Sequence, residues 1–122
     1  MIRVLLVDDQ AAIRKGLRMQ LELEPDLEII GEATNGRDAL TLAPELRPDV
    51  VLMDVRMGVM DGLTATRTLR ASDPSLKVIV LSLFDDAATR VRALDCGARA
   101  FVGKHEPAER LLSAIRRVAG AA

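Results

Sequence analysis

The feature of this sequence that most restricts its fold is a repeated alternation of short apolar runs with longer stretches of helical periodicity. Apolar runs occupy residues 3–7, 50–55 and 77–83, and weaker ones occupy residues 27–33 and 99–103. Strands that are buried on both faces have nearly continuous apolar sequences. The pattern therefore predicts five βα units that form a parallel sheet with helices on both faces.

The stretches between these runs predict five helices. Asp61-Gly62 opens the third helix, Pro74 ends it, a shorter fourth helix is expected at residues 87–94, and Pro107 starts the last. The positions expected to face the core are Ile13, Leu17 and Leu21 in the first helix, Ala39, Leu40 and Ala43 in the second, Leu63, Thr66 and Leu69 in the third, and Leu111, Leu112, Ile115 and Val118 in the last.

Right-handed crossover connections leave few ways to order five parallel strands. We predict an α/β fold with a doubly wound, five-stranded parallel sheet in the order 2-1-3-4-5, which is flavodoxin-like. The run at residues 27–33 is the most polar of the five and is expected at an edge. Ligands of such sheets bind beyond the carboxyl ends of the strands, at the point between the first and third strands where the order reverses.

Composition agrees with one small domain. The chain has 122 residues, a net charge of −1, one cysteine, two Phe and no Trp or Tyr, so aliphatic residues and Met must build the core. The nearly neutral charge gives no sign of electrostatic binding to nucleic acid or to a membrane surface, and no apolar run approaches the roughly 20 residues of a membrane span. We expect a cytoplasmic protein, with the domain at residues 1–119 and a linker or tail beginning at residues 120–122.

Four of the five expected strands end in charged or reactive side chains. Asp8 and Asp9 follow the first strand, Asp54 lies at the end of the third, Ser82 ends the fourth and Lys104 follows the fifth. Each residue alone has an ordinary explanation, because Asp and Ser often cap helices and turns and a lysine is usually solvated at the surface. Their common placement at one edge of the sheet predicts a functional site.

The residue types at this edge favour phosphoryl chemistry. Three carboxylates at close range raise one another's pKa values, and a bound divalent cation relieves that repulsion. Oxygen ligands without His or Cys suit Mg²⁺, with Mn²⁺ as an alternative ion. An aspartate can act as a nucleophile and form an aspartyl phosphate. The Lys104 ammonium could pair with a carboxylate or with an incoming phosphoryl group, and together with the Ser82 hydroxyl it is suited to stabilising the charge of that group.

The same residues give the chain a resemblance to a known family. The segments Val4-Leu-Leu-Val-Asp-Asp9, Val51-Leu-Met-Asp-Val-Arg-Met57 with Met60-Asp-Gly62, Val80-Leu-Ser-Leu83 and Gly97-Ala-Arg-Ala-Phe-Val-Gly-Lys104 resemble the receiver domain of bacterial two-component response regulators. The similarity extends over residues 2–119. Within the family, the chain most resembles receivers that precede a LuxR-type helix-turn-helix domain.

The resemblance implies that a sensor histidine kinase, or a small phosphodonor such as acetyl phosphate, phosphorylates Asp54. Such a domain is a signalling switch with slow autodephosphorylation and not a conventional enzyme. Its output passes to a DNA-binding domain in a longer transcription regulator, or to another partner if the receiver stands alone, and the receiver itself does not contact nucleic acid. The implied roles are Asp9, Asp54 and the backbone carbonyl of Arg56 as Mg²⁺ ligands, Asp8 as a ligand through water, Ser82 as the switch hydroxyl, Lys104 as the phosphate-pairing lysine and Phe101 as the switch aromatic.

Two positions depart from the family pattern. Gly58 stands where the family usually has Pro, which should loosen the loop after Asp54. His105 stands where many receivers have a cis proline, and a cis bond before His is unfavourable. We therefore expect either a trans bond there or an altered loop, with His105 as a solvent-facing loop residue. On the last helix, Arg110, Arg116 and Arg117 are expected to form a solvated face, with a phosphorylation-dependent homodimer interface as the alternative.

Two other classes of function stay open on sequence alone. A metal-dependent phosphatase or phosphotransferase with an aspartate nucleophile commonly carries Asp-x-Asp, but here the second position is Arg56. A flavodoxin-like cofactor binder needs a phosphate-binding loop after the first strand, where Asp8-Asp9-Gln10 would repel a phosphate in the absence of metal. A turnover assay on phosphoesters and the colour of the purified protein distinguish these classes.

Overall fold

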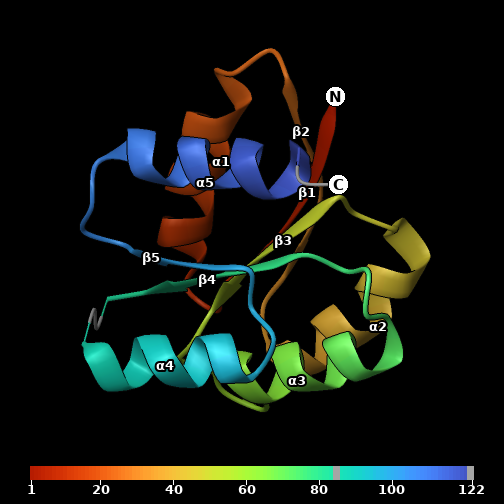
Figure 1. Ribbon diagram of the computed structural model, residues 1–122. Coiled ribbons are helices and arrows are strands. Elements are labelled where there is room, and N and C mark those ends of the chain that lie inside the picture. Colours follow the sequence, from red (N-terminus) through yellow and green to blue (C-terminus); the bar gives the residue numbers. More distant parts are fainter. Residues whose placement is uncertain (84–85, 121–122) are drawn as a thin grey trace.

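The computed structural model describes residues 1–83 and 86–120, in which strands and helices alternate along the chain. The strands form one parallel sheet in the order β2-β1-β3-β4-β5, as the sequence predicts (Figure 1). The elements are β1 (Ile2–Val7), α1 (Ala11–Glu22), β2 (Leu27–Ala33), α2 (Gly36–Leu46), β3 (Val50–Asp54), α3 (Gly62–Ser72), β4 (Val78–Ser82), α4 (Ala87–Asp95), β5 (Ala100–Gly103) and α5 (Ala108–Gly120).

Two layers of helices cover the sheet. Helices α1 and α5 lie against one face, while α2, α3 and α4 lie against the other (Figure 1). Because neighbouring residues of a strand point to opposite faces, Val4 and Leu6 of β1 enter one core and Leu5 and Val7 enter the other. Every residue of β3 and β4 is buried, which explains why their sequences are continuously apolar.

Strand β2 lies at an edge of the sheet, as its polar sequence predicts. Its register against β1 shifts in the middle, because Val4 pairs with Ile29 while Leu5 pairs with Gly31. Ile30 is therefore an extra residue that forms a β-bulge, which was not predicted although the adjacent Gly31 is a residue that often marks one. The bulge sets the register of the second half of β2, which carries Glu32.

Side-chain caps determine where three helices begin. Asn35, Asp61 and Asp86 each accept a hydrogen bond from the backbone N–H three residues later, so α2, α3 and α4 start immediately after them. Element boundaries agree with the predictions to within one or two residues. Helix α5 continues to Gly120, one residue past the predicted end of the domain, and the remainder of the predicted linker, residues 121–122, lies outside the described residues.

One expectation about individual side chains is wrong. Met53 is buried in the core as expected, but Met1 and Met19 are largely exposed, since Met1 precedes the sheet and Met19 lies on the outer face of α1. Arg116 is exposed as predicted, and its guanidinium also binds the carboxylates of Glu24 and Asp26, which ties α5 to the α1–β2 loop. None of the helices that the structure describes is long and apolar enough to cross a membrane.

Candidate functional site

Three carboxylates meet at the carboxyl end of the sheet. Asp8 directly follows β1 and Asp54 ends β3, which is the neighbour of β1, and Asp9 is one residue further along the loop. Carboxylate oxygens from these three residues, the acid cluster, all lie within 4.8 Å of one another. Asp8 and Asp54 are only 2% and 6% exposed, whereas Asp9 is exposed. The predicted convergence of these acids is therefore present.

The ammonium group of Lys104 bridges two members of the acid cluster. Its Nζ lies 2.7 Å from Oδ2 of Asp8 and 3.0 Å from Oδ1 of Asp54, and the lysine side chain is 10% exposed. The backbone N–H of Lys104 also donates to the Ser82 carbonyl at 2.8 Å, which keeps the start of the β5–α5 loop beside β4. Lys104 thus neutralises part of the charge of two buried acids.

One lysine does not fully compensate the acid cluster. Burial raises the pKa of Asp54 above its ordinary value of 3.8; the hydrogen bond from Lys104 opposes this, and the charges of Asp8 and Asp9 add to the rise. Burial acts to lower the pKa of Lys104, but its hydrogen bonds to Asp8 and Asp54 outweigh burial and hold that pKa above 10.5. The raised pKa of Asp54 indicates a site that would be stabilised by further positive charge.

The donor set of the acid cluster fits a hard divalent cation. Carboxylate oxygens are the ligands that Mg²⁺ prefers, and Mg²⁺ is usually bound by one or two carboxylates together with waters and phosphate oxygens. Asp9 is exposed on the open side of the cluster, so an ion there would remain accessible to solvent and substrate. The residues present could therefore hold a metal ion.

A cavity of about 590 Å³ opens beside the acid cluster. It extends from Asp9 and Ser82 past Arg56 to Arg92 of α4. Ser82 is 2% exposed at the end of β4 and lies one residue beyond Leu81, the sheet partner of Asp54. The cavity therefore gives a small molecule or a partner side chain a way to the carboxyl ends of three adjacent strands.

The loop between β3 and α3 is fixed where it meets α3 and has a strained backbone at Val59. A Cβ atom on Gly62 would lie 1.8 Å from the carbonyl oxygen of Asp54, and the Gly62 N–H donates to the Val55 carbonyl at 2.9 Å. Only glycine permits this close approach of α3 to the end of β3. Val59 has a φ of 64°, although the more permissive Gly58 is next to it, so the loop holds a β-branched residue in an unfavourable conformation.

The two residues expected around β5 have different environments. Phe101 is buried, and the guanidinium carbon of Arg90 lies 4.8 Å from the centre of its ring. His105 is exposed in the loop after Lys104, and no cis peptide bond occurs in the described parts of the chain, so the predicted trans bond before His105 is confirmed. Phe101 therefore belongs to the core beneath α4, while His105 remains a surface loop residue.

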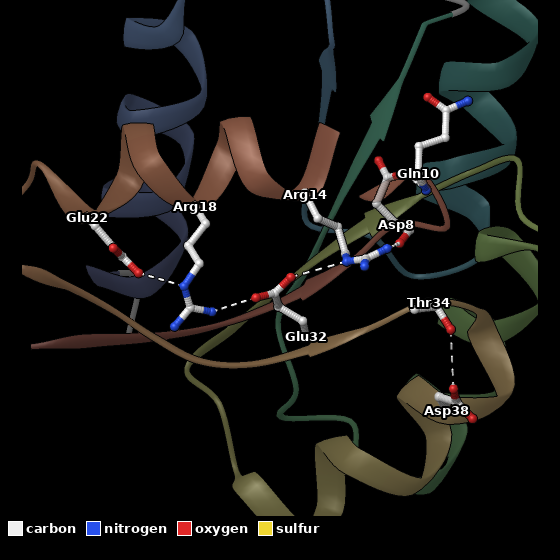
Figure 2. Close-up of polar contacts among 8 residues, drawn as sticks. All are labelled: Asp8, Gln10, Arg14, Arg18, Glu22, Glu32, Thr34 and Asp38. Atoms are coloured by element: carbon white, nitrogen blue, oxygen red, sulfur yellow. Dashed lines mark hydrogen bonds and ion pairs between the residues drawn. The ribbon is translucent and has the colours of Figure 1, made fainter. Parts of the chain in front are cut away.

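One contact of the site, made by a residue of α1, was not predicted from the sequence. The Arg14 guanidinium donates to the backbone carbonyl of Asp8 and also binds Glu32 of β2, as Figure 2 shows. Arg14 follows Asp8 by six residues, a spacing that matches no local hydrogen-bonding motif. Only the folded positions of α1 and β2 bring these groups together.

The chain matches the family described as the response regulator receiver domain over residues 4–116. It is 45% identical over 118 residues to the transcriptional regulatory protein LiaR of Bacillus subtilis, an alignment that covers 95% of this chain and 55% of that protein. The chain spans about half the length of the curated relatives that it matches. As predicted, solved structures of response regulators described as LuxR family are also similar to it.

Solved structures have the same fold. The signal receiver domain of NarL from Mycobacterium tuberculosis is 31% identical with a TM-score of 0.93, covering 99% of this chain and 98% of that one. The CheY chain in a CheX–CheY–BeF3–Mg²⁺ complex from Borrelia burgdorferi is 27% identical with a TM-score of 0.90, covering 96% and 88%. Sequence and fold thus place this chain beside the same group of signalling domains.

Proposed function

Because this chain belongs to the response regulator receiver domain family, we propose that Asp54 accepts a phosphoryl group from a partner histidine kinase. Receiver domains are signalling switches of two-component systems. The observation that carries the proposal is the placement of Asp54, a buried carboxylate at the end of a central strand that lies beside a lysine ammonium and two further acids. An isolated structural acid would not be surrounded in this way.

A metal ion completes the proposed site. Asp8, Asp9, Asp54 and the backbone carbonyl of Arg56 would hold Mg²⁺, with Mn²⁺ as a substitute, and the bound ion would neutralise charge on the phosphoryl oxygens. The similar CheY structure in complex with Mg²⁺ and BeF3 supports this assignment. So does the raised pKa of Asp54, whose main cause is burial in a site where Lys104 alone does not offset the charge of the acid cluster.

In the proposed transfer, a carboxylate oxygen of Asp54 attacks the phosphorus atom of the phosphohistidine. A P–O bond forms, the P–N bond breaks, and the imidazole leaves with the electron pair of that bond. Lys104 is suited to stabilising the charge on the transferred phosphoryl group, because its ammonium already contacts Asp54 and can turn to a phosphoryl oxygen. The Ser82 hydroxyl would donate a hydrogen bond to the same group.

The switch itself is proposed to lie on the α4 side of the site. Movement of Ser82 towards the phosphoryl group would change the packing of Phe101 beneath α4. The β4–α4 loop is proposed to take part, although its residues 84–85 lie outside the described residues. A two-state equilibrium of this kind responds only to the difference in affinity between its states. The contact between Arg90 and Phe101 is the feature that such a change would alter.

The partners follow from the relatives. LiaR is described as a transcriptional regulatory protein and is about twice as long as the matched region. We therefore propose that this receiver, residues 1–119, controls a helix-turn-helix output domain that follows a linker, in a cytoplasmic regulator. A phosphorylation-dependent homodimer that uses the exposed Arg110 and Arg117 is part of the same proposal, while nucleic acid is bound by the output domain alone.

The test is phosphorylation in the absence of a kinase. Incubation with Mg²⁺ and acetyl phosphate should add the mass of one phosphoryl group, read by intact-protein mass spectrometry, which suits a chain without tryptophan. Asp54→Asn should abolish the adduct. Asp61→Asn, which keeps the cap of α3 and alters an exposed acid beside the same cavity, should retain it.

An unmodified wild type, or an adduct that persists on Asp54→Asn, would contradict the assignment. A metal-dependent phosphatase would instead release phosphate from phosphoesters over many turnovers, so the same reaction should also be followed by phosphate release. For the switch, a single adduct that is lost only slowly is expected, with phosphate release limited to this slow autodephosphorylation.

A further inference from the structure

We infer that Arg14 is a positioning residue for Asp8, and that its hold on the Asp8 backbone raises the affinity of the acid cluster for a divalent cation. The inference rests on the proposed function, in which Asp8 helps to bind the metal. It adds a residue of α1 that does not itself reach the ion.

Every polar group of Asp8 is held in the metal-free structure. The backbone N–H donates to the Ala33 carbonyl at 3.1 Å, and the carbonyl accepts from Arg14 Nη1 at 2.7 Å. Of the carboxylate oxygens, Oδ1 accepts from the Gln10 N–H at 2.9 Å and Oδ2 from Lys104 at 2.7 Å. Among the described residues, Arg14 is the one donor recorded for the buried Asp8 carbonyl.

Arg14 is itself fixed by an ion pair with a second partner, Glu32 of β2. Its Nε lies 3.1 Å from Oε1 of Glu32, and its side chain is only 16% exposed. Figure 2 shows the guanidinium lying between the carboxylate of Glu32 and the end of β1. A planar guanidinium that bonds through two of its nitrogens has few orientations left, so β2 and α1 together fix the direction from which Asp8 is held.

Arg18 provides the matched comparison, one helical turn further along α1. It binds the same acid, with Nη1 2.6 Å from Oε2 of Glu32, and its Nε lies 2.6 Å from Glu22. Arg18 is more exposed than Arg14 and has no recorded contact with Asp8 (Figure 2). Removing either arginine breaks an ion pair to Glu32, but only removal of Arg14 releases the Asp8 carbonyl.

Charge and positioning predict opposite effects of removing Arg14. A positive charge this near the acid cluster repels a metal ion, so electrostatics alone would make binding tighter once the charge is gone. Releasing the Asp8 backbone instead leaves a metal ligand free to adopt several orientations, and binding must then order it. Partners that orient metal ligands are commonly worth at least about tenfold in metal affinity, so we expect positioning to prevail.

The experiment measures Mg²⁺ binding by isothermal titration calorimetry for the wild type, Arg14→Met, Arg14→Lys and Arg18→Met. Arg14→Met should weaken Mg²⁺ binding about tenfold, and Arg14→Lys, which keeps the charge but can serve only one of the two partners, should weaken it by a smaller factor. Arg18→Met should bind Mg²⁺ as the wild type does. At saturating Mg²⁺, Arg18→Met should be phosphorylated by acetyl phosphate at the wild-type rate.

The outcomes separate this inference from the function on which it rests. If the wild type binds no Mg²⁺, both are overturned. If the wild type binds Mg²⁺ and Arg14→Met binds it equally or more tightly, only the positioning role of Arg14 is overturned. An equal loss in Arg18→Met also overturns it, because the cause would then be the general loss of ion pairs on α1. If Arg14→Met does not fold, Arg14→Lys decides, and unchanged binding in that variant counts against the inference.

Discussion

Two cations in this protein each bind two carboxylates, and their surroundings differ. Lys104 bridges Asp8 and Asp54 in the site, where all three side chains are at most 10% exposed. Arg116 binds Glu24 and Asp26 between α5 and the α1–β2 loop, where the side chains are 30% to 46% exposed. The distances from nitrogen to oxygen are similar in the two groups, between 2.7 and 3.0 Å.

The two groups differ in the pKa values of their acids. Hydrogen bonding from Arg116 lowers the pKa of Asp26, as expected for an acid with a satisfied partner. The pKa of Asp54 is raised by burial although Lys104 lies 3.0 Å away. In the surface group, Arg116 therefore compensates the charge of its acids, whereas Lys104 does not fully compensate the charge of the buried acids. An acid cluster with incompletely compensated charge is suited to binding a further cation.

The largest effect should come from removing Lys104. Lys104→Gln leaves Asp8 and Asp54 buried without their shared cation, and breaking one partner of a buried pair costs about 3–5 kcal/mol. Urea unfolding at neutral pH in the presence of a chelator measures the loss, and added Mg²⁺ should recover part of it. A loss no greater than that of Arg116→Gln would show that the two groups do not differ energetically.

Alkaline pH should produce the next effect. The folded pKa of Lys104 is raised, mainly by its hydrogen bonds in opposition to burial. Its contribution to stability is therefore fully present below its ordinary pKa of 10.5 and is lost as the pH rises through the folded value. The stability difference between the wild type and Lys104→Gln should shrink over that range, while the contribution of Arg116 persists because a guanidinium stays protonated.

Neutralising one acid of each group should give opposite signs. Asp54 has a raised pKa, so its ionisation costs stability as the pH rises above 3.8, and Asp54→Asn should be more stable than the metal-free wild type at neutral pH. Asp26 has a lowered pKa, so its contribution is present at neutral pH and is lost on acidification. Asp26→Asn should therefore be less stable than the wild type, and a common sign for both variants in urea unfolding would contradict the comparison.

The smallest effect is expected at Arg116. An exposed ion pair competes with water and is screened by salt, so Arg116→Gln should shift the urea midpoint only slightly, and the shift should disappear at high ionic strength. A shift that resists salt would mean that Arg116 contributes through packing of α5 and not through charge.

The direction of the strands determines the part of this protein that could be predicted from the sequence. Parallel strands end at the same edge, so Asp8, Asp54, Ser82 and Lys104 could be brought together from the order of apolar runs alone. The sequence left open whether Lys104 pairs with a carboxylate or with a phosphoryl group. It could not indicate that the lysine bridges both Asp8 and Asp54, because that depends on side-chain conformation and burial. The same limit applies to Phe101, whose position beneath Arg90 depends on the packing of α4.

Contacts between distant segments were also missed. The hydrogen bond from Arg14 to Asp8 requires α1 and the second half of β2 in their folded positions. The register of β2 also depends on a bulge at Ile30, which Gly31 could have suggested but could not place. Val59 is a further case, since the positive φ falls on the valine and not on the adjacent Gly58. Local preference would have assigned the strained position to the glycine.

The contact of Gly62 with the Asp54 carbonyl also has a mechanical consequence. No side chain separates α3 from the end of β3, and the hydrogen bond from Gly62 to Val55 joins the two elements. Strand and helix therefore resist sliding past each other and behave as one stiff block. If Asp54 is phosphorylated as proposed, a displacement that starts there would not pass through this block, and the cavity towards α4 is the direction that stays open to it.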